Sequence, residues 1–528
     1  MDEARAAMKR CLVTFCLFLL LPLLARAHVG SPNVFFEGVA GPHPVRVIIR
    51  PPAVLPGIVQ ADIRVATDGV TNIFLQAVPW ETNAAAAPPV IAVAVAGETN
   101  LYNAAFWLLY GGSYSVRVTV EGVRGGGTVV VPLNSAATQK PAMSPWVLAG
   151  LAAAGIFLFL GAVWLAGAAA RDSTLEFSVA PTTREHLRAR RVAVIATVIL
   201  AAAICGGTFR WRIMDREFRN NALYKPLPAV ATVSTNGPLR LLHLSPLPDN
   251  SGASSWDTLV ADHGKLMHLF LLREPDFKAF AHLHPVRRDA RAFENVLPSL
   301  PAGDYQLYAE ITHENGLSET LTAKVFLPAP TARAPQSPGG SNMLNEVFCQ
   351  SVPAPVGNAP QPFALDADDS WHTSPASVSA SRMKVSPLMG GAYMTFQNAG
   401  ELVENRETSL RFAVSDSEGR PAPLLPYMGM LGHAVVRRTD GAVFTHLHPL
   451  GTISMAAEEI LARRELGVSE ASPTNVLSAT VLGNPTTSNT VAFPYAFPRP
   501  GDYRMWVQVR VPRGVLTGVF DVRVQAAR

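Results

Sequence analysis

The sequence predicts an all-β protein of three immunoglobulin-like β-sandwich domains together with two transmembrane helices. Alternating apolar and polar stretches bounded by Gly, Pro, Asn and Asp recur along the chain, which is typical of strands. A hairpin pattern that begins with Gly-x-Tyr occurs three times, and two long uncharged stretches follow the first of these hairpins. Representative strand-like stretches are residues 45–49, 128–131, 321–326 and 519–524.

The composition fits a membrane-associated chain and argues against nucleic acid as a partner. Charged residues make up 16% of the 528 residues, well below the usual quarter. The formal net charge is +4, and no Lys/Arg-rich run with interleaved aromatic residues occurs. The four cysteines, three of them in apolar runs, support neither a disulfide framework nor a thiolate metal site.

Residues 1–27 predict a secretory signal peptide. Lys9 and Arg10 form a basic end, residues 11–24 form an apolar core, and Ala-Arg-Ala at 25–27 supplies small residues for cleavage. An uncleaved anchor helix is the alternative. Cleavage after Ala27 would leave His28 as the first residue of the mature chain.

Two apolar stretches, residues 144–170 and 192–209, predict transmembrane helices. The arginine-rich loop between them suits the cytoplasm. Four arginines after the second stretch oppose that orientation, but export by the signal peptide resolves the conflict. We therefore expect a cell-membrane protein whose β-sandwich domains lie on the extracytoplasmic (periplasmic) side.

The three Gly-x-Tyr hairpins define the domain organisation. They start at Gly112, Gly303 and Gly501, and in each an alternating strand, a polar turn and a second alternating strand follow. The tyrosine at the start of a late strand is a feature of immunoglobulin-like sandwiches. A generic hairpin with no common ancestry is the alternative. The predicted sandwiches span residues 28–138, 236–328 and 376–528, with a Pro/Ser/Ala/Gly-rich linker at 329–375 and a helical insertion at 452–466.

The second and third domains share a histidine-rich motif. Residues 262–285 and 428–449 both end in His-Leu-His-Pro. Aligning the two segments pairs His268 with His433, and His263 with Met428.

On a hairpin, these histidines converge on one face. Asp440-Gly441 is a strong two-residue turn signal, and counting outward from it places His433 opposite His448. His446 shares that face because strand side chains alternate. In the second domain a longer turn at 273–278 brings His268 near His284, with His282 on the same face.

Such a set of side chains points to a soft metal ion. Neutral imidazole suits copper and zinc, and thioether selects Cu(I), so copper is the expected ion and zinc the alternative. Carboxylates are scarce in the two motifs, which argues against calcium. The candidate ligands are His263, Met267, His268, His282 and His284 in the second domain, and Met428, Met430, His433, His446 and His448 in the third.

At these residues the sequence resembles the exported YtkA-like and CopC-like copper-binding β-sandwich proteins, in architecture and in the His/Met pattern. The resemblance covers about a third of the chain and implies periplasmic copper binding. In some CopC-like members a mature N-terminal histidine is a ligand, which makes His28 a further candidate.

The expected function is therefore copper capture, buffering or handover by a membrane-anchored protein, with a copper-receiving membrane protein as an expected partner. An adhesion or scaffold protein with structural histidines is one alternative. A copper-dependent oxidase or oxygenase is another, although the chain lacks the G-x-S-x-G, H-E-x-x-H, P-loop and nucleotide-binding motifs of common enzyme classes. The chain is therefore expected not to be an enzyme.

Overall fold

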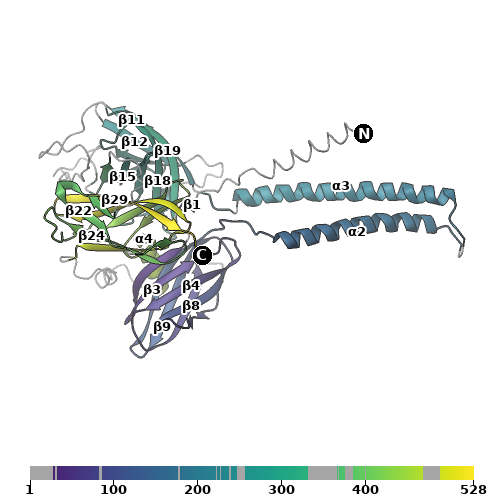
Figure 1. The fold of residues 1–528 in the computed structure, drawn as a ribbon, viewed down its shortest axis with the longest axis horizontal. Helices are drawn as coiled ribbons and strands as arrows, with labels where there is room; N and C mark the ends of the chain where they lie inside the picture. Colours follow the sequence, from purple (N-terminus) through teal and green to yellow (C-terminus); the bar gives the residue numbers. More distant parts are fainter. Residues whose placement is uncertain are drawn as a thin grey trace. The chain divides into compact units, whose positions relative to one another are not determined.

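The computed structural model describes a chain made mostly of β-strands (Figure 1). It describes residues 28–29, 33–81, 86–176, 179–221, 223–225, 227–236, 239–246, 256–330, 366, 368–374, 384–398, 400–467 and 488–527. The predicted signal peptide and most of the predicted linker lie outside these residues. The chain divides into two compact units, of which one holds the β-domains and the other spans Ala136–Lys225 together with Pro52–Gly57.

The N-terminal domain consists of two sheets with apolar inner faces. Val118 and Val120 alternate with more exposed neighbours along one of its strands, as the sequence pattern predicts. One sheet has the order β2 (Val34–Ala40), β3 (His43–Arg50), β4 (Gly57–Val65), β8 (Leu101–Leu108), β7 (Val93–Ala94). The other has the order β10 (Gly125–Ser135), β9 (Gly112–Gly122), β5 (Val70–Pro79), β6 (Val90–Ile91).

The second domain is one path of strands folded into two layers. Strand β11 (Leu227–Asn236) pairs with β12 along most of its length and with β19 at its start, so it belongs to both layers. Leu271, Phe293 and Leu307 lie in the core between them. The strand order is β16 (Val286–Asp289), β17 (Ala292–Val296), β12 (Leu239–Pro246), β11, β19 (Ser318–Leu327), β18 (Gly303–His313), β14 (His268–Arg273), β15 (Ala279–Leu283), β20 (Ser370–Thr373), with β13 (Leu259–Val260) beside β18.

The third domain packs a six-stranded sheet against a four-stranded one around Phe412, Phe493 and Val507. The first sheet has the order β1 (His28–Val29), β26 (Val443–Leu447), β25 (His433–Arg438), β28 (Gly501–Val511), β29 (Gly514–Gln525), β23 (Leu402–Val403). The second has the order β21 (Val385–Pro387), β22 (Tyr393–Phe396), β24 (Thr408–Ser415), β27 (Thr490–Tyr495). The predicted insertion forms helix α4 (Met455–Leu466), which Ser454 caps at its N-terminus.

Two described segments lie where the sequence did not predict them. His28–Val29, predicted as the start of the N-terminal sandwich, pairs by its backbone with Val443–Phe444 of the third domain. The end of the predicted linker forms β20, which pairs with β15 of the second domain. Both segments are short, so neither shows enough alternation to predict a strand.

The three repeated hairpins carry the predicted tyrosine corner. Strands β9–β10, β18–β19 and β28–β29 pair in continuous antiparallel register. In each domain the tyrosine hydroxyl donates to the carbonyl oxygen four residues earlier: Tyr114 to Tyr110 (3.1 Å), Tyr305 to Pro301 (2.9 Å) and Tyr503 to Arg499 (2.7 Å). This shared contact is the feature that marks late strands of immunoglobulin-like sandwiches.

Replacing a corner tyrosine tests the weight of this contact. Tyr503→Phe removes the hydroxyl but keeps the ring, which packs against Phe497. We expect a loss of about 1 kcal/mol in the free energy of unfolding, since one net hydrogen bond is lost. Chemical denaturation measures the change, and Tyr110→Phe, on an exposed side chain, is the control. Equal stability of the two variants would contradict the assignment.

The second unit contains two helices, α2 (Pro145–Asp172) and α3 (Thr183–Asn221), that lie side by side (Figure 1). Each contains an apolar segment long enough to cross a membrane, and its side chains are exposed. Ser144 caps α2 by accepting a hydrogen bond from the backbone NH of Val147. Helix α2 covers nearly the same residues as the first predicted span, and α3 contains the second predicted span and extends beyond it at both ends.

The second and third domains meet face to face through equivalent strands. The ring of Tyr308 on β18 stacks on Phe444 of β26, with centroids 3.8 Å apart. The ring of Phe280 on β15 stacks on Trp506 of β28 at 5.1 Å. Strand β15 corresponds to β26, and β18 corresponds to β28. Exchanging the two domains therefore turns one of these contacts into the other. Such reciprocal contacts are the mark of a two-fold interface.

Candidate metal centre

The two histidine-rich hairpins have the register that the sequence predicts. Ala434 pairs with Leu447, which places His433 beside His448 on the same face. In the second domain Leu269 pairs with Leu283, which places His268 beside His284. The rings of these paired histidines are 5.1 Å apart in both hairpins.

The two hairpin faces point toward each other across the domain interface. His446 of the third domain lies 5.7 Å from His268 and 5.6 Å from His282 of the second, measured between ring centroids. All six hairpin histidines are at most 6% exposed. One buried cluster of imidazoles therefore lies between the two domains.

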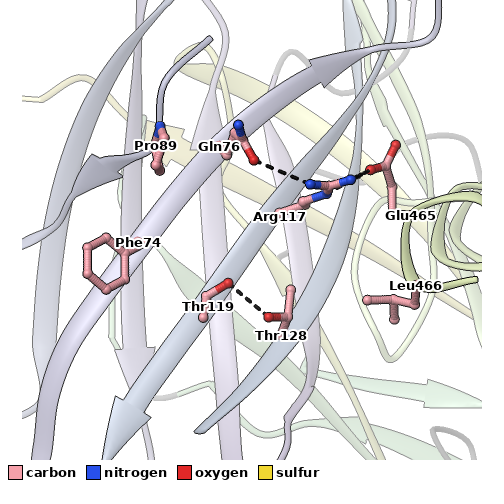
Figure 2. A pocket seen from close by; sticks show the side chains of 8 residues that line it. All are labelled: Phe74, Gln76, Pro89, Arg117, Thr119, Thr128, Glu465 and Leu466. Carbon is pink, nitrogen blue, oxygen red and sulfur yellow. Dashed lines mark hydrogen bonds and ion pairs between the residues drawn. The ribbon is translucent and has the colours of Figure 1, made fainter. Parts of the chain in front are cut away.

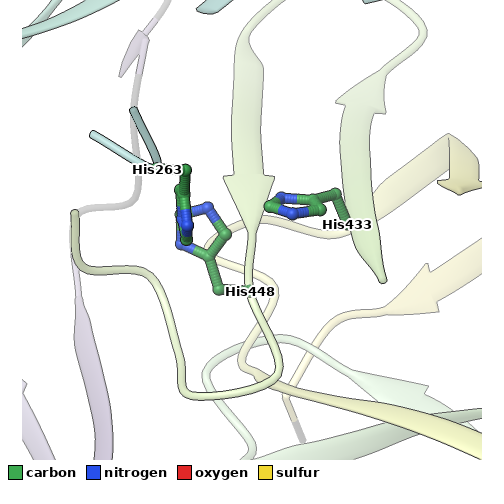
Figure 3. A group of neighbouring side chains, drawn as sticks. All are labelled: His263, His433 and His448. Atoms are coloured by element: carbon green, nitrogen blue, oxygen red, sulfur yellow. The ribbon is translucent and has the colours of Figure 1, made fainter. Parts of the chain in front are cut away.

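His263 completes the cluster from a tight turn. Asp262 and Lys265 exchange backbone hydrogen bonds of 2.8 and 2.9 Å around it, and His263 has a φ of 52°. Its side chain is 2% exposed and lies against His433 and His448 of the other domain, with ring centroids 5.3 and 5.0 Å away (Figure 3). The sequence had grouped His263 with the histidines of its own domain.

The alignment of His263 with Met428 holds in three dimensions. Tyr427 and Met430 exchange the same pair of backbone hydrogen bonds, and Met428 has a φ of 49°. Both residues are followed by a glycine with φ near 80°. The turns are therefore equivalent. The second domain carries an imidazole at this position, and the third domain carries a thioether.

The two equivalent turns each bind one histidine of their own hairpin through a backbone carbonyl oxygen. Nε2 of His268 donates to the carbonyl oxygen of Asp262 at 3.2 Å, and Nε2 of His433 donates to that of Tyr427 at 3.1 Å. A carbonyl oxygen only accepts, so Nδ1 of each neutral ring keeps a free lone pair.

The middle histidines are held by the opposite domain. Nδ1 of His282 donates to Oε1 of Gln508 at 3.0 Å, and Nδ1 of His446 lies 3.0 Å from Oε2 of Glu310. Glu310 stands beside His268 in the sheet register, and Gln508 stands beside His433. Each middle histidine thus contacts a polar side chain of the opposite domain, and the two contacts are related by the same exchange of domains as the aromatic contacts.

The last histidine of each hairpin leaves a nitrogen without a partner. Nδ1 of His284 meets Oδ1 of Asp369 at 3.0 Å, and Nδ1 of His448 donates to the carbonyl oxygen of Ile453 at 3.1 Å. The Nε2 atoms of His284, His448 and His263 are buried with no hydrogen-bond partner among the described residues. Leaving buried nitrogens unpaired is costly, so these three atoms are free to bind a ligand.

Within each hairpin, two ring nitrogens face each other. Nδ1 of His268 lies 3.1 Å from Nε2 of His282, and both atoms carry lone pairs because the outer nitrogens of both rings donate. In the third domain, Nδ1 of His433 lies at a similar distance, 3.2 Å, from Nε2 of His446. Two lone pairs at this distance repel unless a cation lies between them.

The spacing fits a metal ion. Metal–imidazole bonds are about 2.0–2.1 Å long, so nitrogens 3.1–3.2 Å apart subtend an angle of about 100° at a shared ion. His268, His282 and His284 have ligand atoms within 4.8 Å of one another, as have His263, His433 and His448. The outer nitrogens are fixed by carbonyl and carboxylate oxygens, which is how metal-binding histidines are usually oriented.

More carboxylates lie near the histidines than Asp262, the one that the sequence suggests. Asp369 is fully buried, and its carboxylate also accepts the backbone NH of His284. Burial raises the pKa of Glu310 to about 8 and that of Glu458 to about 7, helped in both by the nearby charge of Asp262. Asp366 forms a further group with His284 and Asp369, but it is paired with Lys265.

Burial also keeps the imidazoles neutral. Burial lowers the pKa of four hairpin histidines, and the neighbouring imidazoles lower it further. These four are His268, His282, His433 and His446. The pKa of His448 falls to about 4 for the same reasons. Neutral imidazole is the form that binds metal.

The remaining predicted ligands have other surroundings. Met267 is fully buried in the apolar core of the second domain. Met428 packs with Tyr427 and Val515, and Met430 is buried nearby in the turn. The backbone of His28 pairs with that of Val443 on β26, and the structure does not describe the His28 side chain.

A separate cavity of about 360 Å³ lies beside α4 (Figure 2). Arg117 crosses it and donates to Glu465 at 2.7 Å and to Gln76 at 3.4 Å. The arginine charge is thus already neutralised by a carboxylate. No histidine or cysteine lines this cavity, so its chemistry does not compete with that of the histidine cluster.

Comparisons with known proteins give similarities but no established function. The family described as "Domain of unknown function (DUF8832)" matches residues 389–526, within the third domain. No curated protein matches the chain. Fibronectin(III)-like modules of CbhA from Clostridium thermocellum are 7% identical, with a TM-score of 0.20, over 55% of this chain and 98% of theirs. A putative membrane-anchored protein from Corynebacterium diphtheriae is 9% identical, with a TM-score of 0.13, over 94% of this chain and 96% of its own.

Proposed function

We propose that this protein is a membrane-anchored, extracytoplasmic copper-binding protein that captures, buffers or hands over the ion. The observation that carries the proposal is the pair of facing lone pairs on His268 and His282, 3.1 Å apart in a buried site. Three more imidazole nitrogens of the cluster are buried and have no hydrogen-bond partner among the described residues. The three β-domains would be immunoglobulin-like sandwiches, and α2 and α3 would span the membrane.

Copper is favoured over zinc by the kind of ligands available. Imidazole binds both ions, but Met428 occupies the turn position that His263 occupies in the other domain. Thioether adds affinity for Cu(I) and little for zinc. Hard cations would prefer oxygen, and the carboxylates here are used as hydrogen-bond or ion-pair partners.

Metal analysis of the full chain tests the proposal. We expect the detergent-solubilised protein, purified without chelators or metal-affinity steps, to bind about two copper ions per chain and to keep them in competition with zinc. The double variant His284→Ala/His448→Ala should lose most of the copper, since it removes two of the unpartnered nitrogens. His243→Ala, which changes a histidine outside the cluster, should keep the copper.

An unchanged copper content in the double variant would refute the site. Absence of metal in the unchanged protein, together with lower stability in the double variant, would instead favour an adhesion or scaffold protein with structural histidines.

A further inference from the structure

The seven imidazoles form one cluster in which neighbouring rings are almost as close between the domains as within them. Ring centroids lie 4.7–5.4 Å apart within the His268, His282 and His284 set. Across the interface, His446 lies 5.7 Å from His268 and 5.6 Å from His282. His263 lies 6.0 Å from His268 and 5.0 Å from His448. Two ions bound here would share one ligand shell.

Acidic side chains lie around the imidazoles and suit a cationic ligand. Asp369 and Glu310 contact the outer nitrogens of His284 and His446. Asp262 is buried beside His263 at 3.9 Å, and Glu458 is close enough to Asp262 for their charges to interact. Carboxylates therefore lie next to the imidazoles on both sides of the cluster, and a buried charge is tolerated when an opposite charge lies beside it.

The approximate two-fold symmetry assigns one ion to each domain. Nδ1 of His268 and Nε2 of His282 and His284 face one position. His263, His433 and His448 offer ligand atoms at the other position, where Nε2 of His446 lies 3.2 Å from Nδ1 of His433. The equivalent of His263 on the first side is Met428, so the two positions are unlike.

We propose that the cluster holds two copper ions as one dinuclear centre on this approximate two-fold axis, close enough for their unpaired electrons to couple. The inference rests on the proposed function, because it takes copper as the bound ion. It goes further by joining the two hairpins in one dinuclear centre to which both domains contribute.

Electron paramagnetic resonance of the full chain loaded aerobically with copper tests this inference. Two isolated Cu(II) ions would give a signal that integrates to the whole bound copper. A coupled pair gives a much weaker signal, or a half-field transition that isolated ions lack. We expect the coupled result. Loading the same protein with zinc first and then with a single equivalent of copper should restore a full, uncoupled copper signal.

Variants on one side provide a second measurement. His282→Ala/His284→Ala removes two ligands of one ion, so the copper content should fall to about one ion per chain. The signal per copper ion should rise, because the remaining ion has lost its partner. His243→Ala is the control and should retain both the copper content and the coupled signal.

The outcomes separate the two proposals. Two bound copper ions with a full, isolated signal would overturn the dinuclear centre and leave copper binding intact. Failure of the unchanged protein to bind copper would overturn both. If the double variant does not fold, the zinc-then-copper loading of the unchanged protein decides the question.

Discussion

Copper binding should stabilise the docked second and third domains by about 5 kcal/mol when free copper is a hundredfold above the dissociation constant. An ion that binds only the folded state contributes about 2.7 kcal/mol at that ratio, and two ions contribute twice as much. The effect is large because the ligands come from both domains and the unfolded chain does not bring them together. His263, for example, reaches the histidines of the third domain.

The thermal unfolding midpoint of the detergent-solubilised chain, with and without copper, measures this stabilisation. The double variant His284→Ala/His448→Ala should show little shift on adding copper, and His243→Ala should shift like the unchanged protein. A copper-induced shift of equal size in the double variant would mean that the stabilising ions bind elsewhere.

Acidification should destabilise the metal-free protein between pH 6.5 and about 4. Burial holds the pKa of the cluster histidines below 6.5, and that of His448 at about 4. Such groups contribute their full stability above pH 6.5, and the contribution is lost as the pH falls toward their folded-state pKa values. For His448 alone the shift corresponds to roughly 3 kcal/mol.

Two carboxyls oppose this trend. The pKa of Glu310 is raised to about 8 and that of Glu458 to about 7, so their contributions are present at low pH and are lost as the pH rises through those values. Five histidines outweigh two carboxyls, and we expect a net loss on acidification. Thermal midpoints measured across this range in the presence of a copper chelator test it. His268→Gln/His433→Gln should flatten the profile, whereas rising stability toward pH 4 would contradict the prediction.

The hairpin half of the site was predictable because local rules determine it. The Asp440-Gly441 turn fixes the register of β25 and β26, and strand alternation then places His446 on the same face as His433 and His448. The three corner tyrosines were predictable for the same reason, since the Gly-x-Tyr pattern repeats. Composition alone was enough to predict α2 and α3 as apolar helices.

The contacts between domains were not predictable, because no local rule relates one sandwich to another. Asp369 is 85 positions from His284 and lies in a stretch whose composition predicts a linker. A signal for Glu310 and Gln508 does exist in the sequence: each lies seven residues after the glycine that starts its repeated hairpin. A polar residue at the same position of two otherwise apolar strands could have indicated that both side chains contact the histidines.

The reciprocal contacts of His282 with Gln508 and of His446 with Glu310 have a kinetic consequence. A copper ion bound there as proposed would leave only when the stacked aromatic rings of the interface separate. The rate of metal release would then equal the rate of domain opening, whatever the strength of the individual metal–nitrogen bonds. Because both domains belong to one chain, they reclose at high effective concentration. A protein that takes the ion onward would therefore have to act during these brief openings.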